Sequence, residues 1–274
     1  MAHVIDLSVP LVANTADPNV GELEQWTHES GPARVNQASA ALREQLARDL
    51  RLDAIPQLDA TTFPDGMFLS NEFLTLSVHG GTHMDAPFHY GPTSNGHPAK
   101  QITDIPLEWC MRPGVVLRFR NHRPLQSITA EDVEAELERI GYRITAGDIV
   151  LIETGWDAAL PDPQYFTAHP GMSVEATRML VETGVKIIGI DTNNFDLPPS
   201  HMIREYARTG DAKHLWPCHM YGRQREYVQV ERLGGLDQIP SAFGFTVACF
   251  PVRIQGGGAG WVRPVAIIDE GDQA

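Results

Sequence analysis

Short apolar runs typical of strands recur along most of the chain, with amphipathic patterns typical of helices between some of them. Runs of alternating or continuous apolar residues indicate strands. Such runs occur at residues 3–9, 68–79, 114–117, 149–152, 185–190, 227–230, 243–250 and 262–268. The pattern predicts a mixed α/β fold in which strands outnumber helices, built as a single domain covering residues 1–274.

Two helices are predicted in the middle of the chain. Thr129 followed by Asp132 forms a capping-box pattern, so a helix is expected to begin there and to run to Ile140, with Gly141 as its stop. Ser173 is expected to cap a second helix that ends at Gly184. Because strands and helices alternate here, this part of the sequence predicts an α/β layer arrangement.

The segment at about 14–64 differs from the rest of the chain. It carries Trp26 in a polar setting, and Leu42, Leu46 and Leu50 then recur at four-residue spacing, which indicates a helix with one apolar face. We interpret this segment as an insertion or flap that packs on the main body.

The charge of the chain excludes some partners. The 35 acidic and 21 basic residues give a formal net charge of -14, which disfavours nucleic acids and anionic membrane surfaces. The sequence shows neither a long apolar run nor the pattern of a signal peptide, so we expect a cytoplasmic protein with no membrane partner. The three cysteines are too few and too scattered for a disulfide framework.

The chemistry concentrates in residues 79–89, which read His-Gly-Gly-Thr-His-Met-Asp-Ala-Pro-Phe-His. A single histidine is usually a surface or core side chain, but four coordinating side chains in eleven residues indicate a metal or proton-transfer site. The glycines and Pro87 disfavour a helix, so we expect a strand and a tight turn. This turn can bring His79, His83 and Asp85 around one divalent ion, zinc or manganese, with a position left open for water. Asp85 could instead orient a histidine.

This segment matches the H-x-G-T-H-x-D-x-P-x-H signature of the Putative cyclase family, which includes bacterial kynurenine formamidases, isatin hydrolases and cyclases of aromatic polyketide pathways. The resemblance extends to a distal segment. His219 and Glu231 stand twelve residues apart, followed by Leu-Gly-Gly-Leu-Asp and Pro240. Taken by themselves, His219 and Glu231 could equally be surface groups.

The resemblance implies a swivelling β/β/α fold, a homodimer, and one or two divalent ions per site. It implies that His79, His83 and Asp85 bind the first ion, that Asp85, His219 and Glu231 bind the second, and that His89 is the general acid/base. The expected reaction is hydrolysis of an amide, formamide or lactam bond of a small aromatic substrate by metal-activated water.

Two alternatives stay open. A ring cyclase of aromatic polyketide biosynthesis would use the same residues. The insertion at about 14–64 and the sequence segments 91–96 and 106–110 resemble that branch of the family. The second alternative is a protein that is not an enzyme, namely a metal- or ligand-binding module on the same fold. It predicts a metal with a closed coordination sphere, or the loss of one of the metal-binding residues.

Overall fold

The computed structural model describes residues 2–11, 17, 21–34 and 40–269. The chain divides into two compact units. The main unit comprises residues 1–20 and 77–274, and the second unit, which we call the arm, comprises Gly21–Leu76. Each is described separately below. No helix in the described ranges is long and apolar enough to cross a bilayer.

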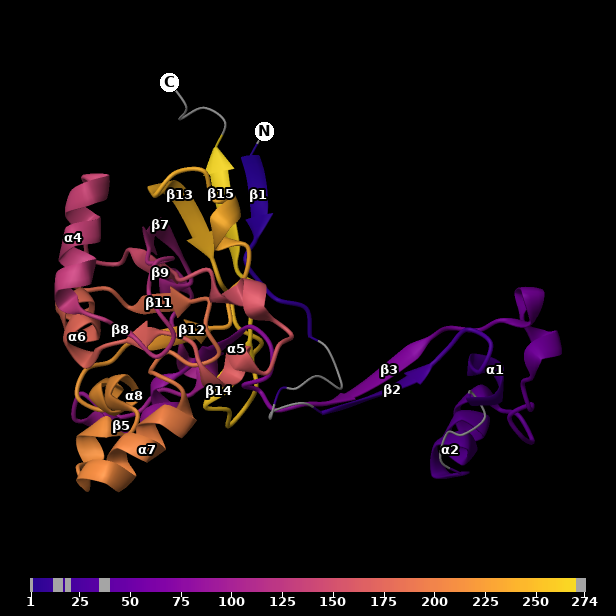
Figure 1. Cartoon of the computed structure of the whole chain (residues 1–274). Coiled ribbons are helices and arrows are strands. Elements are labelled where there is room, and N and C mark those ends of the chain that lie inside the picture. Colours follow the sequence, from indigo (N-terminus) through magenta and orange to yellow (C-terminus); the bar gives the residue numbers. More distant parts are fainter. Residues whose placement is uncertain (1, 12–16, 18–20, 35–39, 270–274) are drawn as a thin grey trace. The chain divides into compact units, whose positions relative to one another are not determined.

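A curled, half-barrel sheet of nine strands forms the centre of the main unit (Figure 1). Its order is β1-β15-β13-β7-β9-β11-β12-β4-β14. The four strands β7, β9, β11 and β12 are parallel, whereas the strands on both sides of them pair antiparallel. The bounds are β1 Ala2–Asp6, β4 His83–Asp85, β7 Met111–Arg118, β9 Ile149–Glu153, β11 Ile187–Ile190, β12 Val228–Glu231, β13 Phe243–Ala248, β14 Ala259–Trp261 and β15 Val265–Asp269.

Both faces of the central strands are buried, because successive side chains of a strand point to opposite faces. On β9, Ile149 and Leu151 join one hydrophobic core, and Val150 and Ile152 join the other. The second core also contains Val133 of helix α4 (Ala130–Ile140) and residues of helix α6 (Val174–Glu182). The continuous apolar runs that predict strands are therefore those of a parallel sheet covered on both sides.

The predicted capping box is confirmed. The side chain of Thr129 accepts a hydrogen bond from the N–H of Asp132, and the Asp132 carboxylate accepts one from the N–H of Thr129. Gly141 ends α4 in the left-handed conformation, as its position after the apolar pattern indicates. Ser173 caps α6 through the N–H of Ala176, and this helix ends at Glu182.

Helices α7 (Pro199–Thr209) and α8 (Pro217–Gly222) were not predicted. Each has proline at its first position, where the missing N–H costs nothing. Helix α8 is short, and its position depends on contacts with distant residues rather than on its own periodicity. The tyrosines Tyr221 and Tyr227 lie in the hydrophobic core.

The arm is built on an antiparallel hairpin, β2 (Glu22–Trp26) and β3 (Asn71–Thr75). Two helices follow β2 in the chain, α1 (Gly31–Arg34) and α2 (Ala40–Leu50), and the latter confirms the helix predicted from the leucine spacing. The apolar run at 68–79 yields only the short strand β3. The expected insertion at about 14–64 overlaps the arm, although residues 14–16, 18–20 and 35–39 lie outside the described ranges.

Candidate active site

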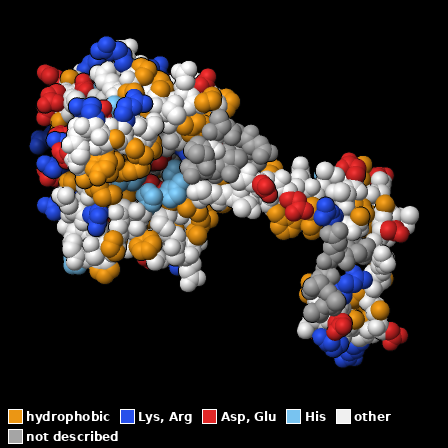
Figure 2. All heavy atoms as spheres, turned by 60° about the horizontal axis from the view of Figure 1, so that its bottom comes forward, with side chains coloured by type: hydrophobic (Ala, Val, Ile, Leu, Met, Phe, Trp, Pro, Cys, Tyr) orange, Lys and Arg blue, Asp and Glu red, His pale blue; other side chains and the backbone are white. Residues whose placement is uncertain are grey.

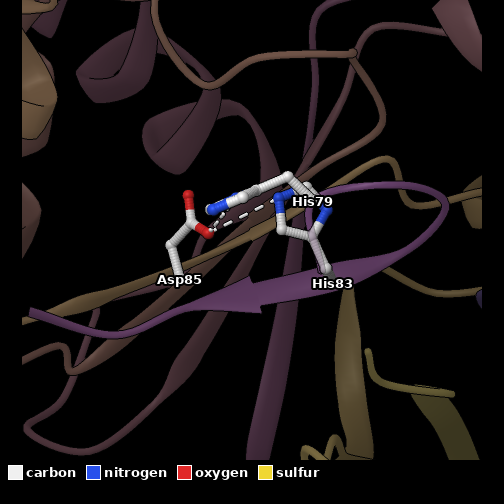
Figure 3. Close-up of side chains that lie close together, drawn as sticks. All are labelled: His79, His83 and Asp85. Carbon is white, nitrogen blue, oxygen red and sulfur yellow. Dashed lines mark ion pairs between the residues drawn. The ribbon is translucent and has the colours of Figure 1, made fainter. Parts of the chain in front are cut away.

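Strand β4 and the turn before it bring together His79, His83 and Asp85 (Figure 3). Nδ1 of His79 lies 3.0 Å and Nε2 of His83 lies 3.5 Å from Oδ1 of Asp85. His83 and Asp85 are two positions apart on β4, so their side chains share one face of the sheet. Gly81, with a φ of 65°, supplies the left-handed turn that returns the chain onto β4. One ligand atom from each of the three residues lies within 4.8 Å of the others.

Unpartnered polar atoms at this point fit a cation. His83 and Asp85 are both 1% exposed, yet Nε2 of His83 and both carboxylate oxygens of Asp85 have no hydrogen-bond partner among the described residues. Burying such atoms without a partner costs about 1–3 kcal/mol each, and more when the group is charged. A divalent ion satisfies them all, and mixed nitrogen and oxygen donors suit zinc or manganese.

The two distal residues named by the resemblance lie at the same place. Strand β12 pairs with β4 so that Glu231 stands opposite His83, and Oε2 of Glu231 is 3.5 Å from Nε2 of His83. Helix α8 carries His219, whose Nε2 lies 3.8 Å from Oδ2 of Asp85 and 3.9 Å from Oε1 of Glu231. The sheet register and α8 thus bring together residues that are more than a hundred positions apart in sequence.

His89 lies on the more open side of the cluster. It belongs to the single-turn helix α3 (Pro87–Tyr90), and its Nε2 is 3.7 Å from Oδ2 of Asp85. The side chains of His89 and His79 are 35% and 28% exposed, whereas those of His83, Asp85, His219 and Glu231 are buried. A second group whose ligand atoms all lie within 4.8 Å of one another is Asp85, His89 and His219. The geometry therefore allows His89 either a ligand role or a proton-transfer role.

Gly258 fixes the place of His89. The carbonyl of Gly258 accepts a hydrogen bond from the N–H of Ala86 at 2.8 Å. A methyl group on Gly258 would lie 3.3 Å from the Cα and N atoms of His89. This close backbone approach explains one glycine of the triple-glycine stretch at 256–258, which shows no nucleotide-binding context.

Asp196 is the residue of this site that the sequence did not reveal. Its carboxylate is fully buried and accepts hydrogen bonds from the N–H of Cys218 at 2.8 Å, the N–H of His219 at 3.3 Å and Nδ1 of His219 at 2.6 Å. Because Nδ1 of His219 donates its hydrogen to Asp196, Nε2 is the ring nitrogen that can serve as a ligand atom, and it lies near Asp85 and Glu231.

The loop after β11 holds both distal residues. Besides Asp196, it contains Phe195, whose N–H donates to Oε1 of Glu231 at 2.7 Å. Asp191, at the start of this loop, instead accepts hydrogen bonds from Thr154 and Gly155. The polar run that follows a buried strand is the only sequence signal that could have indicated Asp196, and it does not distinguish a turn from a pocket.

The buried groups perturb one another. Burial lowers the pKa of His83 to about 4, and burial together with Asp85 raises the pKa of Glu231 to about 7. Burial would also raise the pKa of Asp85, yet the surrounding imidazoles hold it well below its usual range. For His219, the Asp196 carboxylate outweighs burial and raises the pKa to about 10. The pKa of Asp85 is lowered first by the charges of His83 and His89, and then by hydrogen bonds from His219 and His79.

Comparisons with known proteins identify the family of this chain and structures that share its fold. The sequence profile of the Putative cyclase family matches residues 5–197. Isatin hydrolase A from Ralstonia solanacearum has the same fold, with a TM-score of 0.71 and 24% identity over 98% of this chain and 92% of that one. Isatin hydrolase A from Labrenzia aggregata gives a TM-score of 0.66 and 21% identity over 98% of this chain and 94% of that one. For a predicted metal-dependent hydrolase from Bacillus stearothermophilus, the TM-score is 0.62 and the identity 16%, over 98% of this chain and all of that one.

The matched profile covers most of the chain, including the whole cluster at 79–89. This chain therefore belongs to the Putative cyclase family.

Proposed function

We propose that this chain is a metal-dependent hydrolase that cleaves the amide bond of a small aromatic formamide or lactam. The observation that carries the proposal is the set of unpartnered buried atoms of His83 and Asp85, with His79 within reach of the same point. His79, His83 and Asp85 hold the first divalent ion, zinc or manganese. Asp85, His219 and Glu231 form the site for a second ion.

The ion, when bound, polarises the substrate carbonyl and lowers the pKa of water towards about 7. The residues of the chain supply orientation and proton transfer. The substrate approaches from the side on which His79 and His89 are exposed, because the other members of the cluster are buried. Burial lowers the pKa of the His89 imidazole to about 4, so His89 is neutral at pH 7 and can accept a proton from water. It returns this proton to the leaving nitrogen as the carbon–nitrogen bond breaks.

The aromatic substrate is supported by the relatives. Three of the similar structures are isatin hydrolases, one of them bound to the product analogue thioisatinate. At 20–24% identity these structures support the fold of this chain, whereas the substrate has to be tested. We therefore name two test substrates of the same chemistry, an N-formyl aromatic amine and an aromatic lactam such as isatin.

The test combines metal content with turnover. Purified protein is analysed for elements and assayed with both substrates, alongside His83→Ala and, as a matched control, His97→Ala, which alters an exposed histidine outside the cluster. We expect zinc or manganese in the parent protein and in His97→Ala, its loss in His83→Ala, and hydrolysis that follows the metal. Absence of metal from all three proteins would refute the proposal.

His89→Ala separates the two roles that the geometry allows. Loss of rate with metal content retained supports proton transfer, and the loss for a general acid/base is expected to be about 10²–10⁴-fold. Loss of the metal together with the rate would make His89 a ligand.

Ring closure remains the second candidate because the same residues can polarise a ketone and move a proton. The products distinguish the two reactions, since hydrolysis of a lactam adds the mass of one water, hydrolysis of a formamide releases formate and the free amine, and dehydrative ring closure removes the mass of one water. A metal-binding protein inactive on all such substrates would favour the non-catalytic module. The cytoplasmic location and the homodimer stay predictions.

A further inference from the structure

Helix α8, which carries His219, is too short to hold its place by itself. It has six residues, whereas isolated helices shorter than about 12–15 residues are marginal in water. Its start is strained as well, because Trp216, directly before it, has a φ of 47°, in the left-handed region that bulky residues rarely adopt. The position of His219 therefore depends on groups that hold α8 from outside.

Cys218, the residue before His219, is held from both sides. Its N–H donates to the carboxylate of Asp196, and its carbonyl accepts a hydrogen bond from the hydroxyl of Tyr227 at 2.8 Å. A carbonyl can only accept, so Tyr227 gives its single hydrogen to Cys218. The oxygen of the Tyr227 hydroxyl in turn accepts a hydrogen bond from Nε2 of Gln229 at 2.6 Å.

Gln229 lies on β12 at a position where a buried strand ordinarily carries an apolar side chain. It is fully buried, as are Tyr227 and Cys218. Its Oε1 has no partner among the described residues, so within them the bond to Tyr227 is the only one that its side chain makes. Burying an amide group costs free energy unless its hydrogen bonds with water are replaced. A glutamine in this core position therefore indicates a specific role for its bond to Tyr227.

The backbone of Gln229 leads towards the ligands of the first ion. The pairing of β12 with β4 places Gln229 opposite Asp85. The N–H of Gln229 donates to the hydroxyl of Tyr90 at 3.1 Å, and this hydroxyl donates to the carbonyl of Asp85 at 3.3 Å. A buried chain of hydrogen bonds thus runs from Asp85 through Tyr90, Gln229 and Tyr227 to Cys218.

Tyr90 also packs against α8. Its ring is stacked on that of Tyr227 with centroids 5.7 Å apart, and it meets the ring of His219 edge-on at 5.4 Å. A methyl group on Gly222 would lie 2.2 Å from the Tyr90 ring, so the end of α8 is in close contact with this ring. Figure 2 shows histidine side chains at the surface of the main unit, whereas Tyr90 and Tyr227 are buried and support the cluster from inside.

We propose that Tyr227 and Gln229 are positioning residues for His219. Tyr227 fixes the carbonyl of Cys218, and Gln229 fixes the hydroxyl of Tyr227, so that Nε2 of His219 stays within reach of Asp85 and Glu231. The inference rests on the proposed function in one respect, namely that His219 binds the second ion.

The first test uses protein freed of metal by a chelator, so it does not depend on the proposed function. Histidines are labelled with ¹³C and ¹⁵N for NMR, and His219 is identified by the signals that His219→Gln removes. Tyr227→Phe keeps the ring and removes only the hydroxyl, so we expect the ring signals of His219 to shift because α8 moves. Tyr142→Phe, which removes a hydroxyl bonded to Asp148 outside the cluster, is the matched control and should leave these signals unchanged. Unchanged His219 signals in Tyr227→Phe would overturn the proposal.

The second test separates positioning from the mere pairing of two buried polar groups. Replacing both partners of a buried hydrogen bond costs less stability than removing one of them. We therefore expect the metal-free double variant Tyr227→Phe/Gln229→Leu to have a higher Tm than Tyr227→Phe. Its affinity for the second zinc ion should nevertheless stay about 10–100-fold below that of the parent protein, measured by competition with a chromogenic chelator.

The first zinc ion should bind to these variants as it does to the parent protein. If affinity for the second ion recovers together with Tm in the double variant, Tyr227 and Gln229 only satisfy each other, and the proposal is wrong. A parent protein that binds no zinc refutes the proposed function. With no ion or only one bound, the His219 signals alone decide this inference, and the double variant supplies them if Tyr227→Phe does not fold.

Discussion

Nδ1 of His219 lies 2.6 Å from Oδ2 of Asp196, and both side chains are buried. The same carboxylate accepts the backbone N–H groups of Cys218 and His219 at the first turn of α8. Asp196 therefore fixes the tautomer of His219, its ring orientation and the start of the helix that carries it. Asp196 thus contacts the cluster through His219.

Asp196→Asn is expected to lower affinity for the ion bound through His219 by about 10–100-fold, as for other partners of ligand histidines. The amide oxygen of the new asparagine still accepts one backbone N–H. Its NH₂ group, however, then faces Nδ1 of His219, and because NH₂ is a donor it favours the tautomer in which Nδ1 accepts and Nε2 carries the proton. Affinity is measured by competition with a chromogenic chelator, and the tautomer by ¹⁵N NMR.

Asp269→Asn, at an exposed strand end, is the matched control and should bind metal like the parent protein. Unchanged affinity and an unchanged His219 spectrum in Asp196→Asn would show that Asp196 only stabilises α8.

Metal removal is expected to destabilise the main unit. An ion held at a thousand times its dissociation constant stabilises the folded state by about 4 kcal/mol. For a chain of this size, one kcal/mol corresponds to roughly 2–4 °C in Tm. Calorimetry with and without a chelator should therefore show a fall of roughly 10 °C, and His83→Ala should show no further fall when chelator is added. Identical melting curves for the chelated and metal-loaded parent protein would argue against the site.

Asp132 at the start of α4 predicts a pH-dependent contribution to stability. Burial would raise its pKa, but hydrogen bonds from Thr129 and His122 outweigh burial and lower it. A folded pKa below the unfolded one adds stability above about pH 4, which is lost as the pH falls through the folded pKa. Asp132→Asn should thus cost about 0.3–1 kcal/mol at pH 7, the usual size of a charge effect at a helix start. Urea unfolding at pH 7 and pH 3 checks whether this difference shrinks at the lower pH.

Gly258→Ala is expected to displace His89 and to reduce turnover while leaving the metal in place. The added Cβ would lie 3.3 Å from backbone atoms of His89, closer than most such contacts, so that α3 must move by a few tenths of an ångström. Activity and metal content are measured together. Gly256→Ala is the control for strain in the turn. Its φ of 77° makes alanine strained there, but its added Cβ meets nothing within 4 Å and so does not press on His89. Equal loss of turnover in both variants would assign the effect to the turn.

The sequence by itself determined the local features of this protein. The capping box at Thr129 and Asp132, the leucine spacing of α2 and the apolar runs of the central strands depend on neighbours a few positions away, so periodicity predicted them. The cluster of His79, His83 and Asp85 was visible for the same reason, since all three lie within seven consecutive residues.

Only the tertiary structure decided the rest. Glu231 reaches His83 through the pairing of β12 with β4, and His219 reaches Asp85 because Asp196 anchors α8. These contacts join segments far apart in sequence, and no periodicity encodes a sheet register between distant strands. The exposure of Leu42, Leu46 and Leu50 in the arm was equally hidden. Its leucines have the spacing of a packed helix, and whether they pack within the chain depends on contacts that spacing does not specify.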